Sequence, residues 1–381
     1  MVMTRIVISG TGFIGRGLAL ALCQQPRFAL TGIYTRRRPS DVEHPTAELL
    51  SNDLSHCLSD CDILVECSGD VLHACDVIDA AHQRNIPVVT MNSEFHVTVG
   101  SAFLDSGYLT EAEGDQPGCL AALHRRVTAM GFEPVVLGNI KGFLNHTPTA
   151  EDMKMWSQKQ GISLDQVTAF TDGTKIQIEQ AFVANGLGAN ILQDGLAGPS
   201  SAQLQDAAKL LAQRAEQEQC APISDYVLNA GGPPGVFIVA RHEQAQQPLL
   251  QYLKLGEGPF YFLLQPFHLC HLEILHTLDA VVAEAKPLLN NGRTPTVGVV
   301  AVAKQPIHAG DTLERAIGSF TLRGEARMFC EHEKYVPIGL LQHVTFTHDI
   351  PAGAAVEWQH VTLPHSRALI LFRQLLDKSI Q

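Results

Sequence analysis

The residues with the clearest chemical meaning lie near the N-terminus, in the segment Ser9-Gly10-Thr11-Gly12-Phe13-Ile14-Gly15. An apolar strand precedes this segment and an amphipathic helix follows it, which is the context in which a G-x-G-x-x-G pattern indicates dinucleotide binding. The first glycine permits a tight turn, the second lets the backbone approach a pyrophosphate, and the third lets helix and strand pack closely. The helix N-terminus would offer free N–H groups to phosphate oxygens. We therefore expect a nicotinamide dinucleotide to bind at Gly10, Gly12, Phe13, Ile14 and Gly15. The alternative is a tight turn that binds nothing.

The end of the second predicted strand, residues 28–34, indicates which cofactor would bind. An acidic residue about 20 positions after the glycine loop would bind the ribose 2′-hydroxyl of NAD. That position holds Thr35, and Arg36, Arg37 and Arg38 follow it. No carboxylate there would repel a 2′-phosphate, and guanidinium groups bind phosphate well. We expect NADPH rather than NADH, with Arg36 and Arg37 as ligands. The alternative is a basic, solvated loop.

Further candidates follow the next two predicted strands. Ser68 and Gly69 end a buried strand, and such strand ends face the cofactor in a doubly wound sheet, so they are candidates for backbone contact near the nicotinamide. Glu94 and His96 follow the strand at residues 86–91 and are placed to reach a substrate. Either residue is equally compatible with a helix cap or a solvated position.

Carbonyl reduction needs a proton donor or an electrophile at the carbonyl oxygen. A partly buried lysine suits this role, because burial lowers its pKa towards the working pH. Lys254 is the first candidate, since it ends a predicted strand beside a glycine turn. Lys175 is the second, in the first turn of a helix, where it would alternatively bind a substrate phosphate. Asp172 and His268 would orient the lysine or relay a proton. The spacing around His268 matches no zinc signature. A divalent cation would suit a hydroxy-ketone substrate, but no metal ligand is assigned.

Composition limits the class of protein. The 381 residues indicate two or three domains. A net charge of −12 argues against nucleic acid and anionic membranes as partners. Nine scattered cysteines indicate reduced thiols. No signal peptide or membrane-spanning run is visible. We therefore expect a cytoplasmic protein that acts on a small molecule.

Strand and helix patterns predict an α/β protein of three domains. Residues 1–140 would form a Rossmann domain with a doubly wound parallel sheet, whose last strand is residues 132–138. Residues 141–292 would form an α+β domain for the substrate and for oligomerisation. Residues 293–381 would form a small pseudo-symmetric β domain, because residues 307–314 and 350–357 repeat the pattern I-x-A-G-x-x-apolar-E.

Motifs spread along the chain resemble those of homoserine dehydrogenase-like proteins with a C-terminal SAF (β-clip) domain. The similar stretches are residues 10–15, 97–100, 114–117, 172–175, 252–254, 266–273 and 337–340. This resemblance implies an NAD(P)-dependent oxidoreductase that forms a homodimer or homotetramer. One branch, the DXP reductoisomerase-like proteins, converts 1-deoxy-D-xylulose 5-phosphate to 2-C-methyl-D-erythritol 4-phosphate with NADPH, a step of isoprenoid biosynthesis.

One departure from the resemblance bears on the substrate. Homoserine dehydrogenases carry a catalytic lysine after the strand that here ends at Met91, and this chain has Ser93 in that place. Another lysine, Lys141, Lys175 or Lys254, must then supply the cation. We expect an NADPH-dependent reductase of a small phosphorylated or acidic carbonyl compound. The alternatives are a homoserine-type or other hydroxy-acid dehydrogenase, and a cofactor-binding scaffold whose SAF domain binds a ligand.

Overall fold

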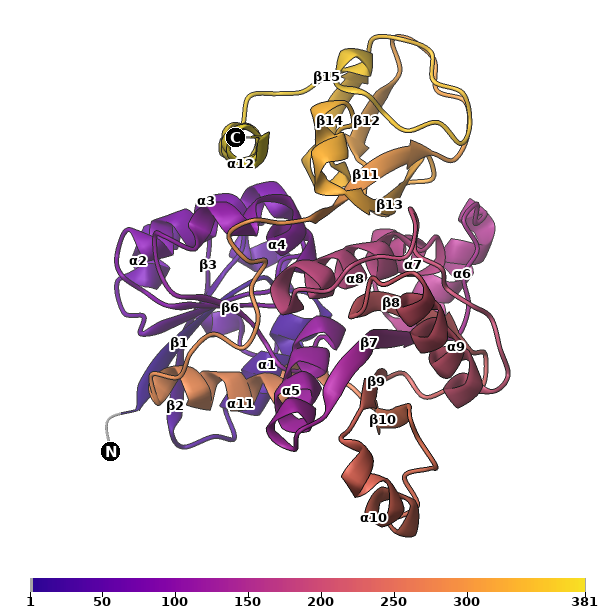
Figure 1. Cartoon of the computed structure of the whole chain (residues 1–381). Coiled ribbons are helices and arrows are strands. Elements are labelled where there is room, and N and C mark those ends of the chain that lie inside the picture. Colours follow the sequence, from indigo (N-terminus) through magenta and orange to yellow (C-terminus); the bar gives the residue numbers. More distant parts are fainter. Residues whose placement is uncertain (1–2, 381) are drawn as a thin grey trace.

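The N-terminal part of the chain is a parallel sheet of six strands with the glycine loop at its centre (Figure 1). This computed structural model describes residues 3–380. The strand order β3-β2-β1-β4-β5-β6 is that of a Rossmann fold. The strands are β1 (Thr4–Ser9), β2 (Phe28–Tyr34), β3 (Leu50–Ser51), β4 (Ile63–Glu66), β5 (Val88–Thr90) and β6 (Leu109–Glu111). The connecting helices are α1 (Phe13–Leu22), α2 (Leu54–Leu58), α3 (Val71–His82) and α4 (Ser93–Val99). The predicted parallel Rossmann sheet is confirmed.

A second sheet of four strands follows, with the order β10-β9-β7-β8. Its strands are β7 (Glu133–Lys141), β8 (Ile223–Leu228), β9 (Val236–Arg241) and β10 (Tyr261–Gln265). The surrounding helices are α5 (Gln116–Ala129), α6 (Ala150–Gln160), α7 (Leu164–Thr171), α8 (Thr174–Leu187) and α9 (Leu204–Gln217). The prediction that residues 132–138 close the Rossmann sheet is wrong, because β7 pairs with β8 and β9 instead. The predicted boundary at residue 140 therefore falls inside a strand of the second sheet.

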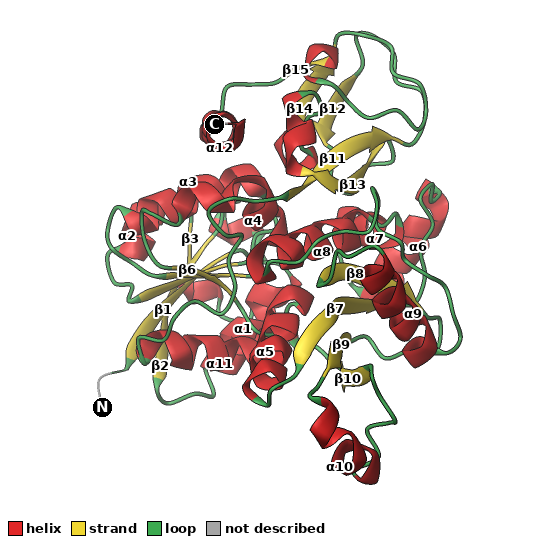
Figure 2. Ribbon diagram, in the orientation of Figure 1, coloured by secondary structure: helices red, strands yellow, loops and turns green. Residues whose placement is uncertain are grey.

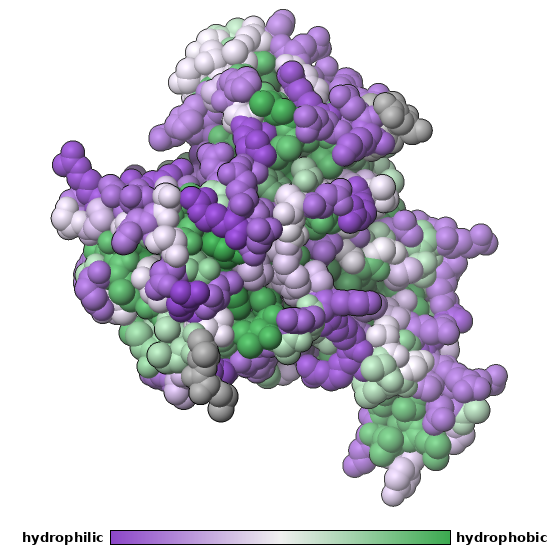
Figure 3. Space-filling view, turned by 90° about the vertical axis from the view of Figure 1, so that its left-hand side faces the viewer, coloured by the Kyte–Doolittle hydropathy of each residue, from purple (hydrophilic) through white to green (hydrophobic). Residues whose placement is uncertain are grey.

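The segment between β9 and β10 projects from the molecule as an arm that carries α10 (Gln247–Tyr252) (Figure 1). Hydrophobic side chains gather on this projection (Figure 3). They include Leu249, Tyr252 and Leu253, which are largely exposed. The predicted strand through residues 250–253 is wrong, since most of these residues belong to α10. Helix α11 (Cys270–Val282) then returns to the Rossmann unit and packs on α1.

The C-terminal part is a small β domain whose last helix returns to the Rossmann unit (Figure 2). Its strands are β11 (Val297–Ala303), β12 (Thr312–Arg315), β13 (Leu322–Met328), β14 (Gln342–Phe346) and β15 (Val361–Thr362). The sequence repeat pairs with itself here, because Ile307 and Ile350 exchange two backbone hydrogen bonds of 2.9 Å. Helix α12 (Arg367–Ile380) then buries Phe372 in the same apolar core as α3. Among the described helices, none combines the length and hydrophobicity that crossing a bilayer requires.

Candidate active site

The glycine loop leaves space for a bound group at the N-terminus of α1. A Cβ on Gly15 would lie 2.2 Å from the carbonyl oxygen of Gly10, so only glycine lets the helix approach the turn this closely. A Cβ on Gly12, in contrast, would have no atom within 4 Å. Gly12 is also the N-cap of α1 and provides no side-chain hydrogen bond to the first turn. The free N–H groups and the open space at Gly12 fit the phosphates of a dinucleotide.

A cavity of about 260 Å³ extends from this loop along the ends of β2 and β4. Most of the predicted cofactor ligands line it, whereas Gly15 and Gly69 do not. Its lining includes Gly10, Gly12, Phe13, Ile14, Arg36, Arg37, Ser68, Tyr34, His73 and Gln166. Gln166 lies on α7, so a helix of the second unit borders the cofactor cavity. Gln166 has no sequence signal for cofactor contact, because its spacing from Ser163 indicates a helix capping box, and the two residues do form one.

The two arginines are held at this cavity by different partners. Arg37 donates a 2.6 Å hydrogen bond to the Thr11 hydroxyl inside the glycine loop. Arg36 pairs with Asp70 at 2.8 Å. Asp70 also accepts a 3.2 Å hydrogen bond from Gln342 of the C-terminal domain. Arg36 is 59% exposed in its side chain, so it remains accessible to a ligand while Asp70 restrains it.

Glu66 links the cofactor loop to the start of α4. This carboxyl group is fully buried at the end of β4. Its oxygens accept hydrogen bonds of 2.9 Å from the Ser68 N–H and from Asn92 Nδ2. Asn92 in turn caps α4 by accepting the N–H of Phe95. Burial raises the pKa of Glu66 to about 7, and the two donors limit that rise.

Lys175 places a cation at the start of α4, after the end of β5. It reaches from the first turn of α8 to the start of α4, where Nζ donates a 2.8 Å hydrogen bond to Ser93. Nζ also lies 3.1 Å from a carboxylate oxygen of Glu94 and 3.9 Å from one of Asp115. The side chains of all three charged residues are about 10% exposed.

The electrostatics of Lys175 differ from the sequence expectation. Burial by itself lowers the pKa of Lys175, but the negative charges of Glu94, Asp115 and Glu179 outweigh burial and hold the pKa above its usual value. The expectation that burial brings the pKa of this lysine down towards neutrality is therefore wrong. Lys175 keeps its proton at neutral pH and presents a positive charge with donor hydrogens.

A second lysine, Lys141, belongs to the same cluster of charged residues. Lys141, at the end of β7, donates a 3.1 Å hydrogen bond to Gln116 and lies 3.4 Å from a Glu179 oxygen. Glu179 on α8 also accepts a 3.0 Å hydrogen bond from Asn139. Burial raises the pKa of Glu179, while Lys141 and then Lys175 lower it. The cluster as a whole contains two lysines and four carboxyl groups: Lys141, Lys175, Glu94, Glu111, Asp115 and Glu179.

Asp172 has a different partner from the one expected. Its oxygens accept a 2.8 Å hydrogen bond from the Thr174 N–H and one of 2.6 Å from Lys304. Lys304 follows β11 in the C-terminal domain, and this pair is almost completely buried. The prediction that Asp172 orients a catalytic lysine is therefore wrong: Asp172 accepts the N–H of the first residue of α8 and fastens the C-terminal domain to the start of that helix. No local pattern around Lys304 signals this pairing, since the two residues lie 132 positions apart.

The other two predicted catalytic residues lie in different places. His268 borders the cluster, with Nδ1 3.3 Å from the carbonyl oxygen of Gly114, which precedes Asp115 in the chain. Lys254 follows α10 on the exposed arm, apart from the Lys175 cluster (Figure 1). The structure thus brings His268 and Lys175 together and leaves Lys254 out. Within residues 3–380, no three His, Cys, Asp or Glu side chains are grouped as metal ligands would be.

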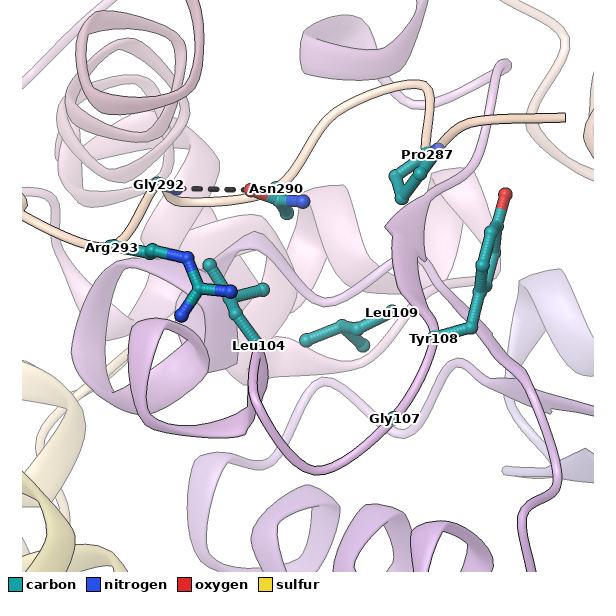
Figure 4. A pocket seen from close by; sticks show the side chains of 8 residues that line it. All are labelled: Leu104, Gly107, Tyr108, Leu109, Pro287, Asn290, Gly292 and Arg293. Carbon is teal, nitrogen blue, oxygen red and sulfur yellow. Dashed lines mark hydrogen bonds between the residues drawn. The ribbon is translucent and has the colours of Figure 1, made fainter.

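A separate cavity of about 470 Å³ lies beside strand β6, where the segment that leads to the C-terminal domain crosses it (Figure 4). Leu104 and Leu109 provide apolar side chains, and Arg293 points towards them. Arg293 pairs with Asp105 on the surface. Because no carboxyl group or lysine of the Lys175 cluster lines this cavity, it is distinct from the candidate active site.

Comparisons with known proteins indicate the class. Residues 114–274, less than half of the chain, match the family model "Oxidoreductase DRL, catalytic domain". A comparison with curated proteins found no match. The fold is similar to that of UDP-N-acetylglucosamine 3-dehydrogenase from Acidithiobacillus ferrooxidans, at 12% identity, 76% and 93% coverage of the two chains and a TM-score of 0.44. S. aureus homoserine dehydrogenase is similar at 11% identity, 89% and 94% coverage and a TM-score of 0.40. Likenesses this distant carry no argument about function.

The matched region contains Asp115, Lys141, Lys175, Glu179 and His268. The oxidoreductase domain therefore holds most of the candidate active site, and a Rossmann sheet with an open glycine loop lies beside it. The chain is an NAD(P)-dependent oxidoreductase.

Proposed function

We propose that the chain reduces the carbonyl group of a small polar compound with NADPH, and that Lys175 acts at the carbonyl oxygen. The observation that carries this proposal is the 2.8 Å hydrogen bond from Lys175 Nζ to Ser93. By resemblance, homoserine dehydrogenases have their catalytic lysine in the place of Ser93. Lys175 on α8 thus brings an ammonium group to the start of α4, where Ser93 itself provides none.

Each group in the site would have a definite task. The cofactor, when bound, supplies the hydride. Lys175 polarises the carbonyl through its positive charge and donates a proton to the developing alkoxide. Glu94 and Asp115 fix the Lys175 ammonium. Arg36 and Arg37 would bind the 2′-phosphate that distinguishes NADPH from NADH.

The charge of the cluster narrows the substrate class. With Glu111 in its neutral form, three further carboxyl groups (Glu94, Asp115 and Glu179) still face two lysines, so the reacting end of the substrate is better accommodated if it is uncharged or cationic. The hydroxy-ketone end of 1-deoxy-D-xylulose 5-phosphate meets this condition, with its phosphate outside the cluster. The family model that matches residues 114–274 supports an oxidoreductase, and the sequence resemblance supports reductoisomerisation of this compound. A homodimer or homotetramer with a SAF-type C-terminal domain is part of the same proposal.

A homoserine-type dehydrogenase is the second candidate. The excess of carboxyl groups over lysines in the cluster favours it, because homoserine and aspartate semialdehyde carry an ammonium group that Glu94 or Asp115 would bind. The same excess of negative charge makes a purely acidic substrate the weaker alternative.

The proposal is tested by NADPH oxidation against a panel of carbonyl compounds that includes 1-deoxy-D-xylulose 5-phosphate and aspartate semialdehyde. We expect one of the two to support turnover, and the identity of that compound separates the two candidates. A Gly12→Val variant is the matched control, because its side chain would fill the open space at the loop and abolish the reaction. Tight NADPH binding with no turnover of any compound would contradict the proposal and support a cofactor-binding scaffold.

A further inference from the structure

Close to Lys175 lies a group of buried polar atoms that have no role in the proposed reduction as described above. Glu111 ends β6 and His96 lies on α4, and both side chains are 0% exposed. Glu111 Oε2 and His96 Nε2 are 3.3 Å apart. Yet both oxygens of Glu111, both ring nitrogens of His96 and Oδ2 of Asp115 make no hydrogen bond with any described residue. Unpaired buried polar atoms are costly, so a group of five requires an explanation.

The surroundings of Glu111 favour its neutral form. The charged and titratable groups that face it are Asp115 from the loop before α5, Lys175 from α8, and Glu94 and His96 from α4. Burial and the neighbouring charge of Asp115 raise the pKa of Glu111 well above its usual value. His96 does not offset this, because burial lowers its own pKa to about 3 and leaves the ring uncharged.

The ring of His96 is held in place by packing. It stacks on Phe182 of α8 with ring centroids 4.3 Å apart and planes 13° apart. His96 therefore presents a neutral imidazole edge to Glu111 and leaves Asp115 as the acceptor on the side of Lys175. Two adjacent carboxyl groups in one buried place hold a proton between them more readily than two negative charges.

We propose that Glu111 stores a proton and passes it through Asp115 to Lys175, replacing the proton that Lys175 gives to the substrate. This inference rests on the proposed carbonyl reduction. The proposed proton path is short, since Asp115 lies 3.9 Å from Lys175 Nζ and is the neighbouring charge that acts most strongly on Glu111. Glu111 acts through other groups, so it is a positioning residue for the proton and not a catalytic residue.

The proton balance is as follows. Lys175 loses one N–H bond as the substrate oxygen gains an O–H bond, which leaves a neutral amine. The Glu111 O–H bond then breaks, Asp115 accepts that proton and releases one to the amine, and Lys175 becomes ammonium again. Glu111 is left as a carboxylate and regains a proton from solvent through Asp115 and Lys175, whose side chains are each 11% exposed. Oxidation of the alcohol runs the same steps in reverse.

The first test needs no substrate. We expect the infrared spectrum of the full chain at pH about 8 to contain a protonated carboxyl band that Glu111→Gln removes, although an ordinary glutamate ionises near pH 4.3. Asp225→Asn is the matched control, because Asp225 is another buried carboxyl group in β8, hydrogen-bonded to Ala197 and Gly198. Identical spectra at this band for wild type and Glu111→Gln would overturn the proposal.

Asp115→Asn gives a second measurement on the same group. Removing the neighbouring negative charge lowers the pKa of Glu111, so the band should weaken at the same pH. An unchanged band in Asp115→Asn would show that Asp115 does not act on Glu111, and would overturn the proposed path. This variant decides the question even where Glu111→Gln does not fold.

The second test uses turnover. Glu111→Gln should lower kcat about 10- to 100-fold, change the pH dependence of kcat and leave the Kd for NADPH unchanged. A purely structural role would leave the pH profile of the remaining activity unmoved, and that outcome would overturn proton supply. Failure of the wild type to turn over any substrate would defeat the proposed function instead, while the infrared band still decides the protonation of Glu111.

Discussion

Replacing Lys304 by methionine tests how the C-terminal domain is fastened to the helix that carries Lys175. The Lys304 and Asp172 side chains are 3% and 0% exposed and meet at 2.6 Å. Lys304→Met keeps most of the side-chain volume but leaves the Asp172 carboxylate buried without its cation. The Ser319 carbonyl also loses the hydrogen bond that Lys304 donates to it. Removing one partner of a buried ion pair costs about 3–5 kcal/mol, and we expect the free energy of unfolding to fall by that amount.

The assay is chemical denaturation followed by circular dichroism, with a double variant and a matched control. The combined variant D172N/K304M removes both charges of this pair. Most of the lost free energy of unfolding should therefore be recovered. Arg27→Met removes a cation from a pair with Asp279 in which both side chains are 45% exposed, and should cost at most about 1 kcal/mol. A loss for Lys304→Met no larger than that for Arg27→Met would refute the reasoning.

Three further predictions concern the Rossmann unit. Gly15→Ala should lower the melting temperature, because its Cβ would lie 2.2 Å from a backbone oxygen. Gly12→Ala should leave the melting temperature unchanged and weaken NADPH binding, because its Cβ would fill open space at the loop. Equal melting temperatures for the two variants would contradict this prediction. Arg36→Ala combined with Arg37→Ala should raise the Kd for NADPH far more than that for NADH, and fluorescence titration showing an unchanged ratio would defeat the 2′-phosphate argument. Glu66 binds a proton more tightly in the folded protein than in the unfolded chain. The free energy of unfolding of the wild type should therefore fall relative to that of Glu66→Gln as the pH rises from about 4.5 to about 7, by up to about 3 kcal/mol. Denaturation midpoints across this range check the prediction, and parallel curves would contradict it.

The parts of the fold that local patterns determine could be predicted. The β-α-β alternation through residue 91 and the glycine loop led to the Rossmann sheet, because strand, turn and helix signals all lie within a few residues of one another. The pattern repeated at residues 307–314 and 350–357 indicated a pseudo-symmetric β domain, and the two copies do pair through Ile307 and Ile350.

The parts that depend on long-range pairing could not be predicted. β7 has the apolar composition of a Rossmann strand, but its partners β8 and β9 lie about 90 and about 100 residues further along the chain. The pattern of residues 250–253 resembles a strand and so favours Lys254, whereas a short helix with exposed apolar side chains forms there. Lys175 was placed correctly on its helix. Its contacts with Ser93 and Glu94 join residues about 80 positions apart. Glu111 gives no sequence signal, because β6 is only three residues long and just one of them, Leu109, is apolar.

The most direct test of the account compares two lysines in one assay. NADPH oxidation is measured with the best substrate of the carbonyl panel for wild type, Lys175→Met and Lys254→Met, alongside NADPH binding by fluorescence. We expect Lys175→Met to lose at least about 100-fold in kcat while it still binds NADPH, and Lys254→Met, on the exposed arm, to keep wild-type turnover. Near-normal turnover by Lys175→Met, or loss of turnover by Lys254→Met alone, would contradict the placement of the active site at Lys175.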